Sequence, residues 1–465
     1  MKGLAVVVAI ALICAAALSR AGERAIEPAP PPAPQSLDAA QITLGSRLAA
    51  VGDCIVCHSA PDSAPFAGGR ALNTPFGTIY STNITPDTET GIGSWTLAAF
   101  ARAMRKGVSR DGHLLYPAFP YVHFTRMSDA DIAAVYAYLM SRDPVRATAP
   151  SNRLIFPLNF RPLIAGWNLL YLHPGPEALD APARPSGLVG DAHAAVQNTP
   201  DATDILDAQW QRGRYLVDGL GHCAACHTPL NLLGAEKSKA ALQGGAVDGW
   251  DAPPLTTLLQ APTPWTREQL VDYLRSGLAS EHGAAAGPMR PVTETLAGAT
   301  DEDVEAIAVY LLSLQTPARV PLNALPAQTA SLPAQAASQT EARQAEQPHQ
   351  AQAATLPGAT LFAAACASCH GAAAPMSTNG GRPSLAQGTA VNADSPRNAL
   401  RMILDGIGWQ GSTSAHFMPP YAQLFTDAQI ADLANYTRAR FSTRKPWPSL
   451  DAAAVARIRK ESRQP

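Results

Sequence analysis

The sequence lacks the features of several large classes of protein. Only 15% of its 465 residues are charged and the formal net charge is −2, so it has no basic surface of the kind that binds nucleic acid. No stretch alternates apolar and polar residues over a useful length, which argues against an extensive β-sheet. We also find no nucleophile–base constellation and no dinucleotide-binding glycine loop. The chain alone is therefore not expected to oxidise an organic substrate.

Cysteine is scarce as well, with seven in the chain. Six of them form three units, CIVCH at 54–58, CAACH at 223–227 and CASCH at 366–370, and the seventh, Cys14, lies in an apolar run near the N-terminus. No cysteine remains for a disulfide framework elsewhere. The cysteines are therefore committed to the three CxxCH units.

Long apolar runs are missing except at the N-terminus. The run from Gly3 to Leu18 follows one lysine and precedes small and polar residues, the layout of a secretory signal peptide. It is shorter than the roughly 20 residues that span a bilayer, so we expect cleavage, with an uncleaved anchor as the alternative. Lipid attachment at Cys14 is less favoured because Ile13 is bulky. The chain is expected in the periplasm, at the outer face of the inner membrane.

Low-complexity segments divide the rest of the chain. One segment, near the N-terminus, is rich in proline, and another, before the third CxxCH unit, is rich in Ala, Gln and Pro. A connector of a different kind lies between the first two CxxCH units, and it is too apolar for a free linker. That connector should pack against a domain or a partner. The predicted organisation is a signal peptide or N-terminal anchor (1–22), a Pro-rich spacer (23–37), domain 1 (38–150), an apolar connector (151–203), domain 2 (204–320), a linker (321–357), domain 3 (358–445) and a C-terminal tail (446–465).

The three CxxCH units lie in the same local frame, which indicates an internal repeat of a helical unit of about 100 residues. Each is preceded by Gly-x-x-Leu and followed by a helix with an N-cap, a capping-box residue three positions later and apolar residues at helical spacing. A shorter helix ending in glycine lies between them. The predicted C-terminal helices are 128–139, 300–314 and 426–441, and the middle helices are 97–107, 267–277 and 397–406.

The CxxCH spacing is the attachment signal for c-type haem. Two thiols one helical turn apart can add to the two vinyl groups of a porphyrin edge, and the adjacent histidine can then reach the iron. A thioredoxin-type dithiol would need a βαβ setting that is missing here. A structural zinc site would need four ligands close together, whereas these pairs are far apart. Three haems are therefore expected on Cys54 and Cys57, Cys223 and Cys226, and Cys366 and Cys369, with His58, His227 and His370 on the irons.

Together, Gly-x-x-Leu, CxxCH and the tyrosine-bearing C-terminal helix resemble class I cytochrome c. The resemblance covers nearly the whole chain after residue 38. It implies an all-α fold of three tandem class I cytochrome c-like domains, with little or no sheet. In that fold an N-terminal and a C-terminal helix cross over one edge of a covalently bound haem c.

The sixth iron ligand in such domains is usually methionine. Met418, followed by proline shortly before the last helix, is expected in domain 3, where Met376 lies too close to CASCH and Met402 lies inside a helix. Met289, again beside proline, is expected in domain 2.

Domain 1 departs from this pattern. Its matching phrase is LYPAFPYVHF, which has Phe119 at the place where a methionine ligand is expected. Met127, directly before a helix cap, is the favoured ligand. His123, His113 or an open iron position remain alternatives, and Met104 lies inside a helix.

Three haems in one chain indicate a wire for electrons. The sequence resembles the triheme cytochrome c subunit of membrane-associated periplasmic dehydrogenases, on the phrases GHLLYPAFPY (112–121), GLGHCAACHTPLNLLGAEK (219–237) and HGAAAGPM (282–289). The resemblance implies a catalytic partner subunit and transfer of electrons to ubiquinone or a terminal oxidase. The connector and HGAAAGPM favour a molybdenum hydroxylase of the nicotinate or isoquinoline type as the partner. A PQQ- or flavin-dependent alcohol or gluconate dehydrogenase is the main alternative.

Two interpretations from other classes stay open. One is a free periplasmic multihaem shuttle without a fixed partner. The other is a peroxidase or reductase that uses an open haem in domain 1, next to Phe119.

Overall fold

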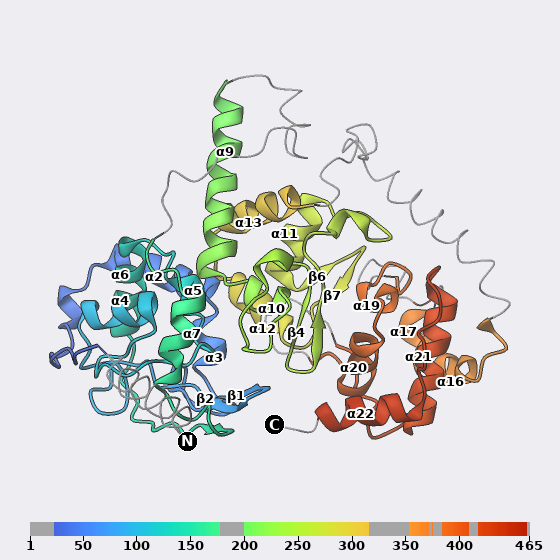
Figure 1. Ribbon diagram of the computed structural model, residues 1–465. Coiled ribbons are helices and arrows are strands. Elements are labelled where there is room, and N and C mark those ends of the chain that lie inside the picture. Colours follow the sequence, from blue (N-terminus) through green and yellow to red (C-terminus); the bar gives the residue numbers. More distant parts are fainter. Residues whose placement is uncertain are drawn as a thin grey trace, which may run out of the picture.

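The computed structural model describes residues 23–176, 200–315, 353–371, 374, 384–408 and 417–462. The predicted signal peptide with Cys14, connector residues 177–199, the linker up to residue 352, Met376 and the last three residues of the tail lie outside these ranges. Within them, three helical domains follow one another from the blue to the red end of the chain (Figure 1). Among the helices of these described ranges, none combines the length and the hydropathy that a bilayer-spanning segment requires.

In each domain a helix before CxxCH packs against the C-terminal helix. The pairs are α2 (Ala39–Val51) with α6 (Asp129–Met140), α9 (Pro200–Tyr215) with α13 (Asp301–Ser313), and α16 (Gly358–Ala365) with α21 (Asp427–Phe441). This is the helix crossing that the resemblance to class I cytochrome c implies.

The glycine of Gly-x-x-Leu lies where the two helices touch. A Cβ on Gly45 would lie 1.9 Å from the carbonyl oxygen of Ala134, and one on Gly213 would lie 1.9 Å from that of Ala306. Any side chain at these positions would push the backbones apart, which explains why glycine stands there. The leucine three residues later, Leu48 or Leu216, is fully buried in the core.

The C-terminal helices begin at the predicted caps. Ser128, Thr300 and Thr426 each accept a hydrogen bond from the backbone N–H three residues later, at 3.0, 3.1 and 3.3 Å. In domain 3 the capping box is complete, because the Gln429 side chain also accepts from the Thr426 backbone N–H at 2.9 Å.

The two predicted acidic capping boxes are not completed in this way. The carboxylate of Asp131 accepts a hydrogen bond from the Tyr215 hydroxyl at 2.6 Å. That of Asp303 pairs with the guanidinium of Arg212 at 2.7 Å. A phenol and a guanidinium donate more strongly to a carboxylate than a backbone amide does, so these side chains turn away from the cap.

The middle helices end at glycine as predicted. They are α4 (Leu97–Lys106), α11 (Arg267–Ser276) and α20 (Arg397–Asp405). Gly107, Gly277 and Gly406 follow them with φ of 62°, 71° and 70°, a region that favours glycine.

Short antiparallel strands supplement the helices, so the fold is mainly helical, as predicted, with small sheets added. The strands are β1 (Ala71–Thr74), β2 (Gly77–Tyr80) and β3 (Arg153–Leu154) in one sheet, β4 (Gly245–Val247) with β5 (Trp250–Ala252), and β6 (Leu278–Ala279) with β7 (Gly283–Ala284). The remaining helices are α3 (Cys54–Cys57), α5 (Tyr121–Phe124), α7 (Leu163–Tyr171), α10 (Ala224–His227), α12 (Met289–Leu296), α17 (Ala367–His370), α19 (Thr389–Asn392) and α22 (Ala452–Ser462), with single turns at Pro34–Ser36, Leu216–Leu220, Ser238–Ala240 and Leu258–Gln260.

Domains 1 and 2 share one continuous apolar core, whereas domain 3 has a core of its own. The connector packs on domain 1 through α7, as its composition suggested. There Asn168 accepts a hydrogen bond from the Tyr121 hydroxyl at 2.6 Å, and the Trp167 indole donates to the Leu233 carbonyl of domain 2 at 3.0 Å. Ile164 of α7 is buried against domain 1.

Candidate haem sites

Each CxxCH unit forms a single helical turn, α3, α10 or α17, which places its two cysteines on one face. These six cysteines form no disulfide with one another. Burial raises the pKa of Cys54 to about 12 and that of Cys57 to about 11, and it raises the pKa values of Cys223 and Cys226 to about 12. These thiols are therefore neutral and available for thioether formation with a vinyl group.

The histidines of domains 1 and 2 are held in one tautomer. Nδ1 of His58 lies 2.7 Å from the Thr82 carbonyl oxygen, and Nδ1 of His227 lies 2.7 Å from that of Pro253. A nitrogen that faces a carbonyl must carry the proton, so Nε2 carries the lone pair that an iron requires. Burial lowers the pKa of both imidazoles, which keeps them neutral. The donor set and its orientation fit a c-type haem in both of these domains.

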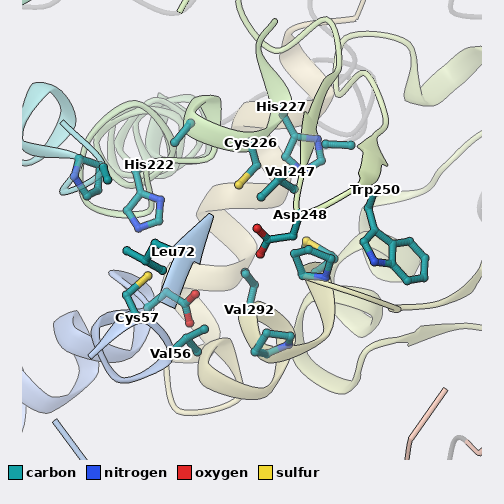
Figure 2. Close-up of a pocket in the computed structure, with 18 of the residues that line it drawn as sticks. Val56, Cys57, Leu72, His222, Cys226, His227, Val247, Asp248, Trp250 and Val292 are labelled. Atoms are coloured by element: carbon teal, nitrogen blue, oxygen red, sulfur yellow. The ribbon is translucent and has the colours of Figure 1, made fainter. Parts of the chain in front are cut away.

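One connected cavity of about 3170 Å³ runs through the three domains. His58, His227 and His370 all line it, together with Met289 and Met418. Figure 2 shows the part between domains 1 and 2, where the sulfurs of Cys57 and Cys226 are directed into the same pocket beside His222 and Asp248. The sites predicted separately from the sequence thus open into a common space.

The two predicted methionine ligands of domains 2 and 3 lie on this cavity. Met289 begins α12. Gly287, two residues earlier, has φ 54°, and a Cβ there would lie 2.4 Å from the Trp250 ring. Met418 pairs with Ile407 through two backbone hydrogen bonds of 2.9 and 3.0 Å.

The favoured methionine of domain 1 lies elsewhere. Met127 is fully buried in the apolar core and does not line the cavity. Its position argues against the predicted role as ligand. Met104, Phe119, His113 and His123 do line the cavity.

The two histidines of domain 1 already have partners on the protein. Nε2 of His123 lies 2.6 Å from Glu236 of domain 2, and Nδ1 lies 3.0 Å from the Asp218 carbonyl oxygen. Nδ1 of His113 lies 2.6 Å from Asp111. His123 therefore joins two domains, a role that no spacing in the sequence indicates.

A contact between domains 2 and 3 was also missed by sequence reasoning. Asn398 of α20 exchanges two hydrogen bonds with the backbone of Asp251, at 2.9 and 2.7 Å. Arg401 donates to the Asp248 carbonyl at 2.9 Å, and its guanidinium lies 5.3 Å from the centre of the Trp250 ring. These contacts hold domain 3 against the β4–β5 turn.

The fold and the three sites together define a multihaem c-type cytochrome. In agreement, the family model for cytochrome c matches residues 42–143, 211–315 and 356–439. The chain belongs to the cytochrome c family and carries three covalently bound haem c groups.

Several known proteins are similar to this chain over more than nine-tenths of its length. A nicotinate dehydrogenase subunit of Pseudomonas putida is 44% identical over 93% of this chain, and this chain spans 33% of that protein. The fructose dehydrogenase cytochrome subunit of Gluconobacter japonicus is 34% identical, with 92% of this chain and 84% of that protein covered. The gluconate 2-dehydrogenase cytochrome c subunit of Pantoea cypripedii is 34% identical, with coverages of 91% and 90%. The chain is thus similar to cytochrome subunits of several dehydrogenases.

Proposed function

We propose that this chain is the electron-transfer subunit of a periplasmic dehydrogenase. It takes electrons from a catalytic subunit of the nicotinate or isoquinoline type of molybdenum hydroxylase and delivers them to ubiquinone or a terminal oxidase. The observation that carries the proposed electron transfer is the connected cavity, which the histidines of all three CxxCH units line. Bound haems supply one-electron chemistry.

The residues of the chain then have defined tasks. The cysteines hold each group, and the tautomers of His58 and His227 are fixed toward iron. The shared core of domains 1 and 2 fixes the distance between two sites. Hydrogen bonds that Asn398 and Arg401 donate to the carbonyl oxygens of Asp251 and Asp248 fix the third site against the second. Rigid spacing supports transfer because electron hopping requires short distances between haem edges.

A partner surface is suggested by the connector. Phe156, Leu169 and Leu170 are 85%, 86% and 62% exposed, and Leu232 of domain 2 is 95% exposed. Three of these four side chains belong to the connector, and exposed apolar side chains concentrated in one segment suggest an interaction site. The catalytic subunit or the membrane surface would cover them. Peripheral membrane association at the periplasmic face accords with the apolar N-terminal run.

The nicotinate type is preferred because that relative has the higher identity over 93% of the chain. The fructose and gluconate relatives, at 34%, support the alternative of a PQQ- or flavin-dependent partner. A free shuttle is the third candidate, and it would leave the connector exposed.

The test is reconstitution of the purified cytochrome with catalytic subunits of each type. We expect a stable complex, and haem reduction on adding nicotinate or a related N-heterocycle, only with the molybdenum hydroxylase. Reduction by alcohol or gluconate through a quinoprotein or flavoprotein partner would move the assignment to the alternative. A cytochrome that stays monomeric and accepts electrons from every donor at similar rates would support the free shuttle.

A further inference from the structure

The unusual domain 1 can be compared with the other two by counting from the glycine that ends each middle helix. The three glycines share a positive φ and a hydrogen bond from their N–H to the carbonyl four residues earlier. Domains 1 and 2 remain equivalent eight residues after the glycine, because the same backbone hydrogen bond is present in both. Leu115 N–H donates to the Gly107 carbonyl at 2.7 Å, and Ala285 N–H donates to the Gly277 carbonyl at 2.7 Å.

Twelve residues after the glycine lies the position of the expected sixth ligand. It holds Met289 in domain 2, Met418 in domain 3 and Phe119 in domain 1. All three are half-buried, pack against an apolar core and line the cavity. Phe119 has no sulfur and cannot bind iron.

Three residues before the glycine lies a second position facing the cavity. It holds Leu274 in domain 2, Ile403 in domain 3 and Met104 in domain 1. All three are buried, with 6%, 8% and 5% exposed, and line the cavity. Each domain therefore has one methionine across these two positions. In domains 2 and 3 the methionine follows the glycine and an aliphatic residue precedes it, whereas in domain 1 Met104 precedes the glycine and Phe119 follows it.

The other candidates of domain 1 have different tasks. Met127 directly precedes the cap Ser128, and both Met127 and Ile132, four residues into the helix, are buried in one core, the arrangement of a hydrophobic staple. The equivalent position in domain 2 is Ala299, which has no sulfur. His123 has both ring nitrogens engaged.

The helix that carries Met104 is firmly held. Arg105 donates to the Thr125 carbonyl at 2.7 Å and to the Met127 carbonyl at 2.8 Å. A Cβ on Gly107 would lie 2.6 Å from the Tyr121 ring, so helix and loop fit closely. The backbone of Met104 is thus fixed beside the cavity, and its long unbranched side chain can extend into it.

We propose that the thioether of Met104 is the sixth ligand of the iron held by His58. Phe119 fills the space that Met289 and Met418 occupy in the other domains. Domain 1 then has His/Met ligation from a helix rather than from a loop, and no iron position is open to small molecules. The proposal concerns the haem site alone and does not depend on which dehydrogenase is the partner.

The test compares the full-length, haem-loaded protein with Met104→Leu and Met127→Leu. Low-temperature EPR and the near-infrared bands of the oxidised protein count His/Met haems, and carbon monoxide titration of the reduced protein counts open irons. We expect three His/Met haems and no bound carbon monoxide in the wild type and in Met127→Leu. Met104→Leu should lose one His/Met haem and bind one carbon monoxide per chain.

A third variant, Met104→Leu combined with Phe119→Met, should regain three His/Met haems, because the thioether returns to the loop position. Carbon monoxide binding by the wild type would mean an open iron and would overturn the proposal. Loss of a His/Met haem in Met127→Leu would do the same. Should Met104→Leu fail to incorporate haem, the wild-type and Met127→Leu spectra still decide between these outcomes. None of these readouts uses a dehydrogenase, so a wrong partner assignment leaves them unaffected.

Discussion

Replacement of Gly213 by alanine tests the helix crossing that builds each domain. The new Cβ would lie 1.9 Å from the Ala306 carbonyl oxygen and 2.8 Å from Cβ of Tyr310. Ordinary contact begins near 3.4 Å, so α9 and α13 must separate by roughly 1.5 Å, an overpacking that costs about 3 kcal/mol, the upper end of the usual range, because the obstacle is backbone. Alanine returns about 1 kcal/mol through its helix propensity.

We therefore expect Gly213→Ala to lower the free energy of unfolding by about 2 kcal/mol. The matched control is Gly166→Ala in α7, where a Cβ would meet nothing within 4 Å. That change should be neutral or stabilising by up to about 1 kcal/mol. Urea titration followed by circular dichroism measures both variants. Equal stability of Gly213→Ala and the wild type would refute the close crossing, and with it the reason given for the Gly-x-x-Leu motif.

Three further predictions concern the contacts around the sites. His123→Leu leaves Glu236 without its partner across domains 1 and 2 and should cost roughly 1–3 kcal/mol in urea unfolding. Arg401→Met removes a hydrogen bond and the contact with Trp250, so hydrogen exchange should become faster in the β4–β5 turn. Burial lowers the pKa of His282 to about 4, so the unfolded chain binds the proton more tightly. Stability should fall by up to about 3 kcal/mol as pH drops from about 6.5 to 4.

Each of these has a control and a contradicting result. His113→Leu, at a half-exposed side chain, should cost little, and an equal loss at His113 would remove the special role of His123. Unchanged exchange in Arg401→Met would show that domain 3 is held by other contacts. His282→Gln should flatten the acid loss, since glutamine can keep a hydrogen bond to Gln269. The same acid loss in that variant would place its origin elsewhere.

Much of the repeat could be predicted because its signals are local. The cap at Thr426, the stop at Gly277 and the CxxCH turns each depend on a few neighbouring residues, and the structure has them where the sequence predicts. Contacts between distant segments were not predictable in this way. Asp131 was expected to complete a cap, but the Tyr215 hydroxyl, from another domain, takes its carboxylate.

The ligand of domain 1 shows the same limit. Met127 stands before a helix cap, a place that a ligand and a staple residue can share in the sequence. Only its burial away from the cavity separates the two roles. The sequence places Met104 within a helix, and in the structure that helix borders the cavity. The proposal of Met104 depends on aligning domain 1 with domain 2 after Gly107. The hydrogen bond from the Leu115 N–H to the Gly107 carbonyl supplies that alignment, which the sequence alone does not show.

Exchange of electrons among three haems in one chain is tested most directly by a potentiometric titration of the purified protein. The titration is followed at the haem absorption bands, beside His58→Ala, His227→Ala and His370→Ala. We expect reversible uptake of three electrons per chain in the wild type and the loss of one His/Met haem in each variant. Two results would contradict electron transfer through three haems. One is uptake of fewer than three electrons by a protein in which all six cysteines carry thioether bonds to haem. The other is a histidine variant that retains all three His/Met haems.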